Sequence, residues 1–102
     1  MAGLAPAASL PYCSLMEYEW DNGKANANLG KHGVDFTAAV EVFADPRLLV
    51  IVDRRYGEDR YRAIGLVNDV VLSVAYTMRG ELCRIISARR ASRRERREYD
   101  TL

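Results

Sequence analysis

The sequence predicts one α+β domain with the element order β-α-α-β-β-β-β-α. Apolar residues recur at helical spacing before residue 45, and strand-like segments rich in β-branched residues follow it. Short turn sequences separate those later segments, which favours pairing between neighbours. A chain of 102 residues can bury one modest core but not two. These observations together favour a small antiparallel sheet with helices packed on it.

The first 15 residues, MAGLAPAASLPYCSL, predict no regular element. Their two prolines and many small residues disfavour both helix and strand. They also lack the basic start and long apolar stretch of a signal peptide. We interpret residues 1–15 as a flexible leader and residues 16–102 as the domain, which begins at the second methionine, Met16.

A short strand and a helix are predicted next. The alternation in EYEW indicates a strand with Tyr18 and Trp20 toward the core. Asp21 can cap a helix that runs to about His32, where Gly33 can end it in the left-handed conformation. At helical spacing one arc of this helix is polar, and its members are Lys24, Asn28, Lys31 and His32.

A second, shorter helix follows, with Asp35 as its cap. Its apolar residues fall at i, i+3, i+4 and i+7, the spacing of a buried stripe: Phe36, Ala39, Val40 and Phe43. Asp45-Pro46 ends it. The aromatic residues of this part of the chain, Trp20 included, are therefore expected to pack in the core rather than to stack on bases.

Four strands are predicted after residue 46, in the segments LLVIVD, RYRAIGLV, VVLSVAYTM and LCRIISA. Asn68-Asp69 and Arg79-Gly80-Glu81 are short enough to be hairpin connections, so these neighbours should pair antiparallel. Ser92-Arg93-Arg94-Glu95 has the form of a capping box and opens a terminal helix of about two turns.

Positive charge is concentrated at the C-terminal end. The segment from Arg84 to Asp100 holds seven arginines and three acids, whereas the whole chain has a formal net charge of only +1. Arg93 and Arg94 lie in the first turn of the terminal helix, where the dipole disfavours a cation by about 0.3 to 1 kcal/mol. Two interpretations stay open: a solvated basic face, or a surface that attracts phosphates or an acidic partner.

Several short patterns occur in order: WDNGKANANLGKHGVDF, VFADP, DRYRAIG, YTMRG and RIISARRASRRERREY. Together they resemble the BrnT family, small RelE-like ribonuclease toxins of type II toxin–antitoxin systems, from about Met16 to Tyr99. The resemblance implies a RelE-like antiparallel sheet, metal-independent RNA cleavage and neutralisation by a BrnA-like antitoxin. Arg62 departs from the family pattern, where an apolar residue is more usual, and adds charge near the expected RNA surface.

The composition favours metal-free chemistry independently of this resemblance. One histidine and two distant cysteines, Cys13 and Cys83, cannot build a tetrahedral site, and they predict no disulfide. No compact carboxylate pattern and no Gly-rich phosphate loop is present. Lys, Arg and His residues remain, and they suit cleavage by an RNA 2′-hydroxyl, which needs proton transfer and a neutralised phosphorane. No metal and no cofactor is predicted.

Arg79, at the end of a strand in YTMRG, is the first candidate for a phosphate clamp, because its planar fork can bond two phosphate oxygens. The alternative is a hairpin arginine paired with Glu81. Arg60 and Arg84 lie on adjoining strands and could reach the same face, or could pair across strands with Asp59 or Glu81.

Three further residues complete the predicted catalytic set. Histidine is the residue type best suited to act as acid or base near neutral pH, so His32 could do so, although a histidine near a helix C-terminus is also stabilised by the dipole. Lys31 beside it could bind phosphate. By strand alternation Thr77, rather than Tyr76, shares the face of Arg79, which leaves Tyr76 for the core.

A second set of cations is expected to guide RNA or to contact the antitoxin, and the sequence does not separate these uses: Lys24, Arg62, Arg89, Arg90, Arg94 and Arg97. Glu95 is explained by the capping box alone.

The sequence therefore predicts an endoribonuclease toxin that cuts RNA by 2′-hydroxyl attack and inhibits growth. Its expected partners are RNA and a BrnA-like antitoxin with a ribbon-helix-helix domain, bound in a hetero-oligomer that reaches operator DNA only through the antitoxin. No apolar run approaches the length of a membrane span, so a soluble, cytoplasmic protein is expected. The alternative is a non-catalytic module that binds nucleic acid or a partner in autoregulation.

Overall fold

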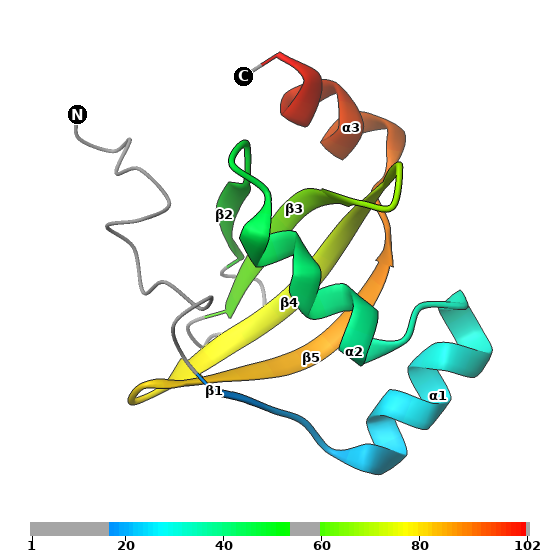
Figure 1. Cartoon of the computed structure of the whole chain (residues 1–102), viewed down its shortest axis with the longest axis vertical. Helices are drawn as coiled ribbons and strands as arrows, with labels where there is room; N and C mark the ends of the chain where they lie inside the picture. Colours follow the sequence, from blue (N-terminus) through cyan, green and yellow to red (C-terminus); the bar gives the residue numbers. More distant parts are fainter. Residues whose placement is uncertain (1–16, 54–59, 102) are drawn as a thin grey trace.

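The computed structural model describes residues 17–53 and 60–101, so the predicted leader, Cys13 and Asp59 lie outside the described residues. The chain is α+β, as predicted (Figure 1). Its elements, in chain order, are β1 (Glu17–Glu19), α1 (Asn22–His32), α2 (Phe36–Ala39), the 3-10 helix η3 (Val40–Ala44), β2 (Leu49–Asp53), β3 (Arg60–Val67), β4 (Val70–Arg79), β5 (Leu82–Arg90) and α3 (Arg93–Asp100).

The five strands form one sheet in the order β1-β5-β4-β3-β2. Strands β2 to β5 pair antiparallel with their neighbours, but β1 pairs parallel with β5, with Glu19 opposite Arg84. The sheet is therefore mixed, and the prediction of a wholly antiparallel sheet was wrong. Alternation along a strand reports which face is buried but not the direction of its partner, and no short turn joins β1 to β5.

The predicted helix ends are present. Asp21 accepts a hydrogen bond from the Lys24 backbone at 2.8 Å, and Gly33, with φ of 71°, donates to the Leu29 carbonyl. Asp35 caps α2 through the Thr37 backbone N–H. The second helix differs from the prediction, because its regular part ends at Ala39 and continues as η3.

Helix η3 lies very close to the sheet. A Cβ atom added at Gly65 of β3 would lie 3.0 Å from the Val42 backbone oxygen, so only glycine lets η3 approach this strand so closely.

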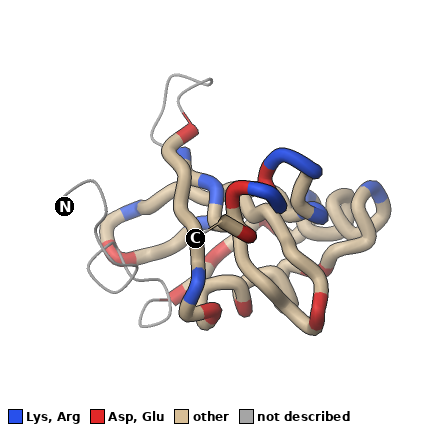
Figure 2. Tube along the Cα trace, turned by 90° about the horizontal axis from the view of Figure 1, so that it is seen from above, with Lys and Arg blue, Asp and Glu red and all other residues tan. Residues whose placement is uncertain are grey.

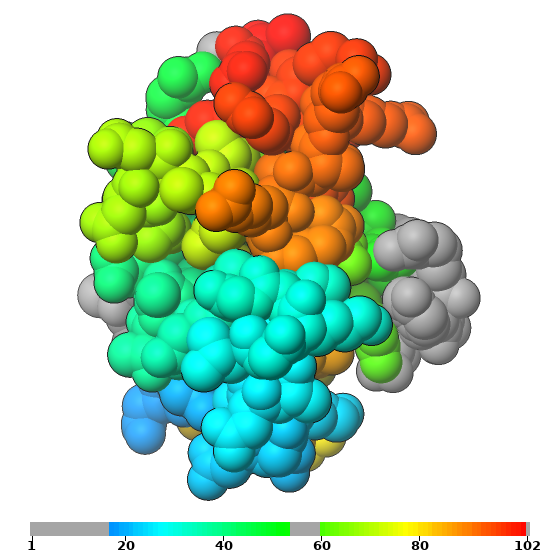
Figure 3. Space-filling model, turned by 90° about the vertical axis from the view of Figure 1, so that its right-hand side faces the viewer, coloured from blue at the N-terminus to red at the C-terminus, as the bar shows by residue number. Residues whose placement is uncertain are grey.

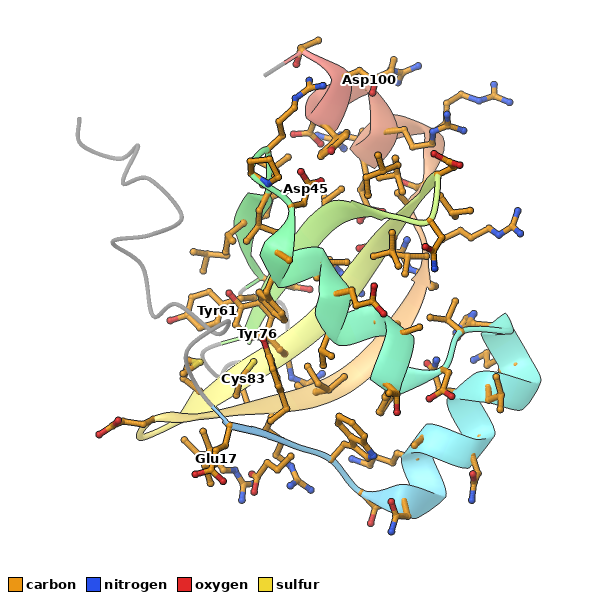
Figure 4. The ribbon with its side chains drawn as sticks, viewed as in Figure 1. Glu17, Asp45, Tyr61, Tyr76, Cys83 and Asp100 are labelled. Carbon is orange, nitrogen blue, oxygen red and sulfur yellow. The ribbon has the colours of Figure 1, made fainter. Side chains whose placement is uncertain are left out.

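The core lies between one face of the sheet and the segment α1, α2 and η3 (Figure 1). Phe43 stacks with Tyr18 at 5.8 Å between ring centroids and meets Tyr76 edge-on at 5.1 Å. Tyr76 also stacks on Tyr61 of the neighbouring strand, and Cys83 lies on the same face (Figure 4). Tyr76 is buried, as predicted.

The predicted buried stripe also reaches this core. Phe36, Ala39 and Phe43 are buried and Val40 is partly buried against them. Trp20 packs edge-on against Phe36 at 5.8 Å, which confirms the packing role predicted for these aromatic residues.

Contrary to the prediction, Asn28 does not lie on an exposed polar arc of α1, because its side chain is buried. Its amide donates to the carbonyls of Val34 at 3.0 Å and Ala88 at 2.8 Å, and its oxygen accepts from the Ala88 N–H at 3.0 Å. Among the described residues, β1 pairs with residues 82–84 of β5, and the Asn28 amide takes the place of a neighbouring strand further along that edge. Leu29 beside it is instead 47% exposed.

Helix α3 lies on the other face of the sheet, where Glu95 reaches Ser73 of β4. Its capping box is formed as predicted, with reciprocal bonds between Ser92 and Glu95. The β3–β4 hairpin turns through Asn68 and Asp69, both with positive φ, and Gly80 has φ of 61° in the β4–β5 hairpin. In the described ranges, no helix has the length and apolar character needed to cross a membrane.

Candidate functional site

Three of the predicted catalytic residues share one line across the sheet. Thr77 of β4 pairs with Arg84 of β5, and the register of Tyr61 with Tyr76 places Arg60 of β3 opposite Thr77. Tyr61 and Tyr76 point into the core, so by alternation these three side chains are on the opposite face. We call Arg60, Thr77 and Arg84 the cross-strand row.

Arg79 lies two residues beyond Thr77 on β4, at the hairpin end of the same face. It is exposed. Among the described residues none forms an ion pair with Arg79, so the alternative pairing with Glu81 is not formed. The guanidinium is therefore open to an incoming anion.

Carboxylates stand at both ends of the cross-strand row. Glu19 of β1 is in register with Arg84, and its Oε2 lies 3.2 Å from Arg84 Nη1. Asp53 of β2 is in register with Arg60. Sequence reasoning missed both acids, because it expected Asp59 or Glu81 as partners. Glu19 could not have been placed there without knowledge of the parallel pairing.

The structure does not bring the α1 candidates to this site. Lys24, Lys31 and His32 are exposed on α1, which packs against β5 and contributes Ala25 to the core on the helical side. The cross-strand row lies on the opposite face. Helix α1, which carries Lys31 and His32, lies along the β5 edge of the sheet, away from the strands β3 and β4 that carry Arg60 and Arg79 (Figure 1).

Glu95 is the centre of a charged network that holds α3 on the sheet. Its carboxylate accepts two hydrogen bonds from Arg89, at 2.8 and 3.1 Å, and one from the Ser73 hydroxyl at 3.3 Å. Arg62 donates to the same hydroxyl at 3.0 Å and lies 3.7 Å from Asp53. Glu95 therefore does more than cap its helix, which the sequence interpretation did not foresee.

The network also changes the acidity of Glu95. Burial would raise its pKa, but the hydrogen bonds from Arg89 and from the Ser92 backbone, with the charges of Arg89 and Arg62, lower the pKa from 4.5 to about 2. The carboxylate thus stays ionised wherever the protein is folded above that pH.

A pH dependence of stability follows from this lowered pKa. The stabilisation is complete above the unfolded-state pKa of 4.5 and is lost as the pH falls toward 2, because the unfolded state then binds the proton first. We expect the free energy of unfolding of Glu95→Gln, which keeps a capping side chain, to fall less steeply between these pH values than that of the wild type. Urea unfolding at a series of pH values measures this, and a variant with the wild-type slope would contradict it.

Arg62 and Arg89, predicted to contact RNA or antitoxin, are thus engaged inside the protein, with side chains only 16% and 31% exposed. A cleft of about 440 Å³ lies beside them, and its lining mixes acids and cations: Ile51, Val52, Asp53, Arg62, Arg89, Ser92, Arg94, Glu95 and Glu98. Three acids among three arginines make this cleft a poor site for a polyanion.

The remaining predicted cations lie outside this network. Arg94 is 86% exposed and lies 4.0 Å from Glu98 one turn later. Arg90 and Arg97 are exposed. Figure 2 shows how lysine and arginine positions interleave with acidic ones around the C-terminal helix. In the part of the chain that the structure describes, no group of three His, Cys, Asp or Glu residues could hold a metal ion.

Comparison with known proteins agrees with the resemblance found in the sequence. A model of the family described as ribonuclease toxin, BrnT, of type II toxin-antitoxin system matches residues 20–95. This range includes the cross-strand row, Arg79 and the Glu95 network. No curated protein matches the chain. On the family match, the chain belongs to the BrnT family of ribonuclease toxins of type II toxin–antitoxin systems.

Proposed function

We propose that this protein is a metal-independent endoribonuclease that cleaves RNA through attack of a 2′-hydroxyl on the adjacent phosphate, and that it inhibits growth in this way. The observation that carries the proposal is the alignment of Arg60, Thr77 and Arg84 across three strands, with exposed Arg79 at the end of the same face. This cationic face matches the charge that develops on a phosphorane.

Each residue has a separate role in this proposal. The fork of Arg79 bonds two oxygens of the scissile phosphate, and Arg60 and Arg84 neutralise the phosphorane. Thr77 lies between them in the strand register, and its hydroxyl orients the phosphate by a hydrogen bond. Glu19 holds Arg84 in place through their 3.2 Å ion pair.

The proton transfers are proposed to involve the carboxylates at the ends of the row, because His32 is exposed on α1, which packs along the β5 edge and not on the row. Glu19 or Asp53 accepts the proton of the 2′-hydroxyl as it attacks. The carboxylic acid that forms returns a proton to the 5′-oxygen that leaves. The products are a 2′,3′-cyclic phosphate and a 5′-hydroxyl.

Metal independence has a direct test. Cleavage by the purified protein should persist in excess chelator, and the new ends should carry a 2′,3′-cyclic phosphate, since the side chains alone supply charge and proton transfer. The measurement is gel analysis of RNA ends with and without chelator. If chelator abolishes cleavage and added magnesium or manganese restores it, the mechanism is wrong.

The partner in this proposal is a BrnA-like antitoxin with a ribbon-helix-helix domain, which neutralises the toxin in a hetero-oligomer and carries it to operator DNA. The exposed cations outside the row that have no carboxylate partner among the described residues, Lys24, Arg90 and Arg97, contact RNA or this antitoxin. The helices on one face of the antiparallel strands β2 to β5 support a RelE-like arrangement. A purely binding module would predict no RNA damage on expression without antitoxin, whereas a toxin predicts slowed growth that co-expression reverses.

A further inference from the structure

Two adjoining hollows of about 430 and 200 Å³ lie on the outer side of α3 and share Ala91 and Arg96 as lining residues. The larger is lined by α3 and Ala91, and the smaller lies between α3 and the β3–β4 hairpin. Figure 3 shows α3, in orange and red, beside this hairpin, in yellow-green. We call this feature the α3 groove, and its lining residues are Asp69, Val70, Val71, Arg90, Ala91, Arg93, Arg96, Arg97 and Asp100.

The α3 groove has an excess of positive charge. It contains four exposed arginines, Arg90, Arg93, Arg96 and Arg97, against the two acids Asp69 and Asp100. Within residues 17–53 and 60–101, none of these four guanidiniums takes part in an ion pair. Arg89 and Arg94 differ, because each has a carboxylate partner.

Folding does not account for these four arginines. The inner side of α3 is held by Glu95 and by Tyr99, whose hydroxyl donates to Asp45 while Arg47 lies over its ring. Burial, and after it the hydrogen bond to Asp45, raise the pKa of Tyr99 to about 12. The outer arginines contribute to none of these contacts, and Arg93 opposes the helix dipole. The helix is thus anchored on one side and presents cations on the other.

The lining favours a phosphate backbone over a protein partner. Arg93, Arg96 and Arg97 follow at i, i+3 and i+4, so their Cβ atoms form one surface patch with neighbours about 5 to 6 Å apart. The larger hollow offers no apolar side chain beyond the methyl group of Ala91, and the smaller adds only Val70 and Val71, with no aromatic side chain. Protein interfaces need a buried apolar or aromatic anchor, whereas nucleic-acid interfaces are polar and strongly positive.

We propose that the α3 groove binds phosphates of the RNA substrate at a distance from the bond that is cut. This inference rests on the proposed function of the cross-strand row. Arg84 and Arg90 lie six residues apart on β5, about 20 Å along the strand at ~3.3 Å per residue. Arg90 is on the face of the buried Leu72 and Arg84 is on the other face, so the path between the two surfaces is at least this long. Only an RNA that spans this distance can occupy both surfaces, so the groove selects for longer substrates.

The test compares RNA affinity of the wild type with that of the triple variant Arg93→Gln, Arg96→Gln and Arg97→Gln. A 2′-O-methyl RNA cannot attack its own phosphate, so binding is measured by fluorescence anisotropy without cleavage. Loss of three phosphate contacts should make the slope of log K, the RNA association constant, against the logarithm of the salt concentration shallower by about 2. A short oligonucleotide that cannot span both surfaces and occupies the row should bind both proteins equally.

Arg94→Gln is the matched control, because it removes the same charge from the same helix on the side of Glu98. Arg94→Gln should change the salt slope less than any one of the three groove substitutions does. An unchanged slope in the triple variant would overturn the inference. So would an Arg94→Gln change in slope as large as that of one groove substitution. So would loss of antitoxin binding with RNA affinity intact, which would assign the groove to the antitoxin. Wild-type protein that binds RNA without cleaving unmodified RNA would instead count against the proposed function alone.

Discussion

Arg79→Lys is expected to lower the rate of RNA cleavage about 100-fold or more, with little change in RNA affinity. Lysine keeps the charge at the end of β4 but cannot bond two phosphate oxygens in one plane. Removing a donor that meets charge only in the transition state typically costs on the order of 100-fold in rate. Single-turnover cleavage at saturating RNA, together with anisotropy, separates the two quantities.

A residue of the α3 groove should behave differently from Arg79. Arg97→Ala is expected to weaken RNA affinity and its salt dependence, because it removes a phosphate contact rather than a transition-state contact. Circular dichroism and thermal unfolding must show that both variants fold. If folded Arg79→Lys cleaves at the wild-type rate, Arg79 is only a hairpin residue, and the clamp must be sought at Arg60 and Arg84.

Asn28→Ala is expected to reduce the free energy of unfolding by about 3 kcal/mol. The change leaves three buried backbone groups without their partner: the N–H and the carbonyl of Ala88, and the carbonyl of Val34. Each such group costs about 1 to 3 kcal/mol when unsatisfied, so about 3 kcal/mol is the lower end of the range for three groups. Urea unfolding of the purified variant measures the loss.

Asn26→Ala is the control for this prediction. Asn26 is exposed on the same helix, so the same substitution there reports the helix propensity of alanine without the buried bonds. The Asn26 variant should unfold within about 0.5 kcal/mol of the wild type or be slightly more stable. Similar values for the two variants would show that the Asn28 amide contributes little.

Features encoded by neighbouring residues could be predicted from the sequence. The Asp21 cap, the Gly33 stop and the Ser92 capping box each depend on bonds within a few residues, so the local pattern is sufficient. The hairpins after β3 and β4 are of the same kind. Strand alternation was likewise enough to give Thr77 and Tyr76 opposite faces.

Features that depend on distant residues could not be predicted in this way. The bonds between Asn28 and Ala88 join residues 60 apart, and helical periodicity alone made Asn28 look like a surface residue. The ion pair of Arg84 with Glu19 depends on the parallel pairing of β1. Local pattern was therefore enough to place the arginines of the hairpin strands on one face, but it could predict neither the neighbouring carboxylates nor the position of α1, which carries His32.

The pairing of β1 with β5 has a consequence for the timing of folding during synthesis. Glu19 leaves the ribosome early, but its partner Arg84 is 65 residues further along the chain. Contacts between residues so far apart form late, because a long loop must close first. A nascent chain therefore cannot complete the arginine face until β5 has emerged from the ribosome. The proposed site stays incomplete until that strand has been made.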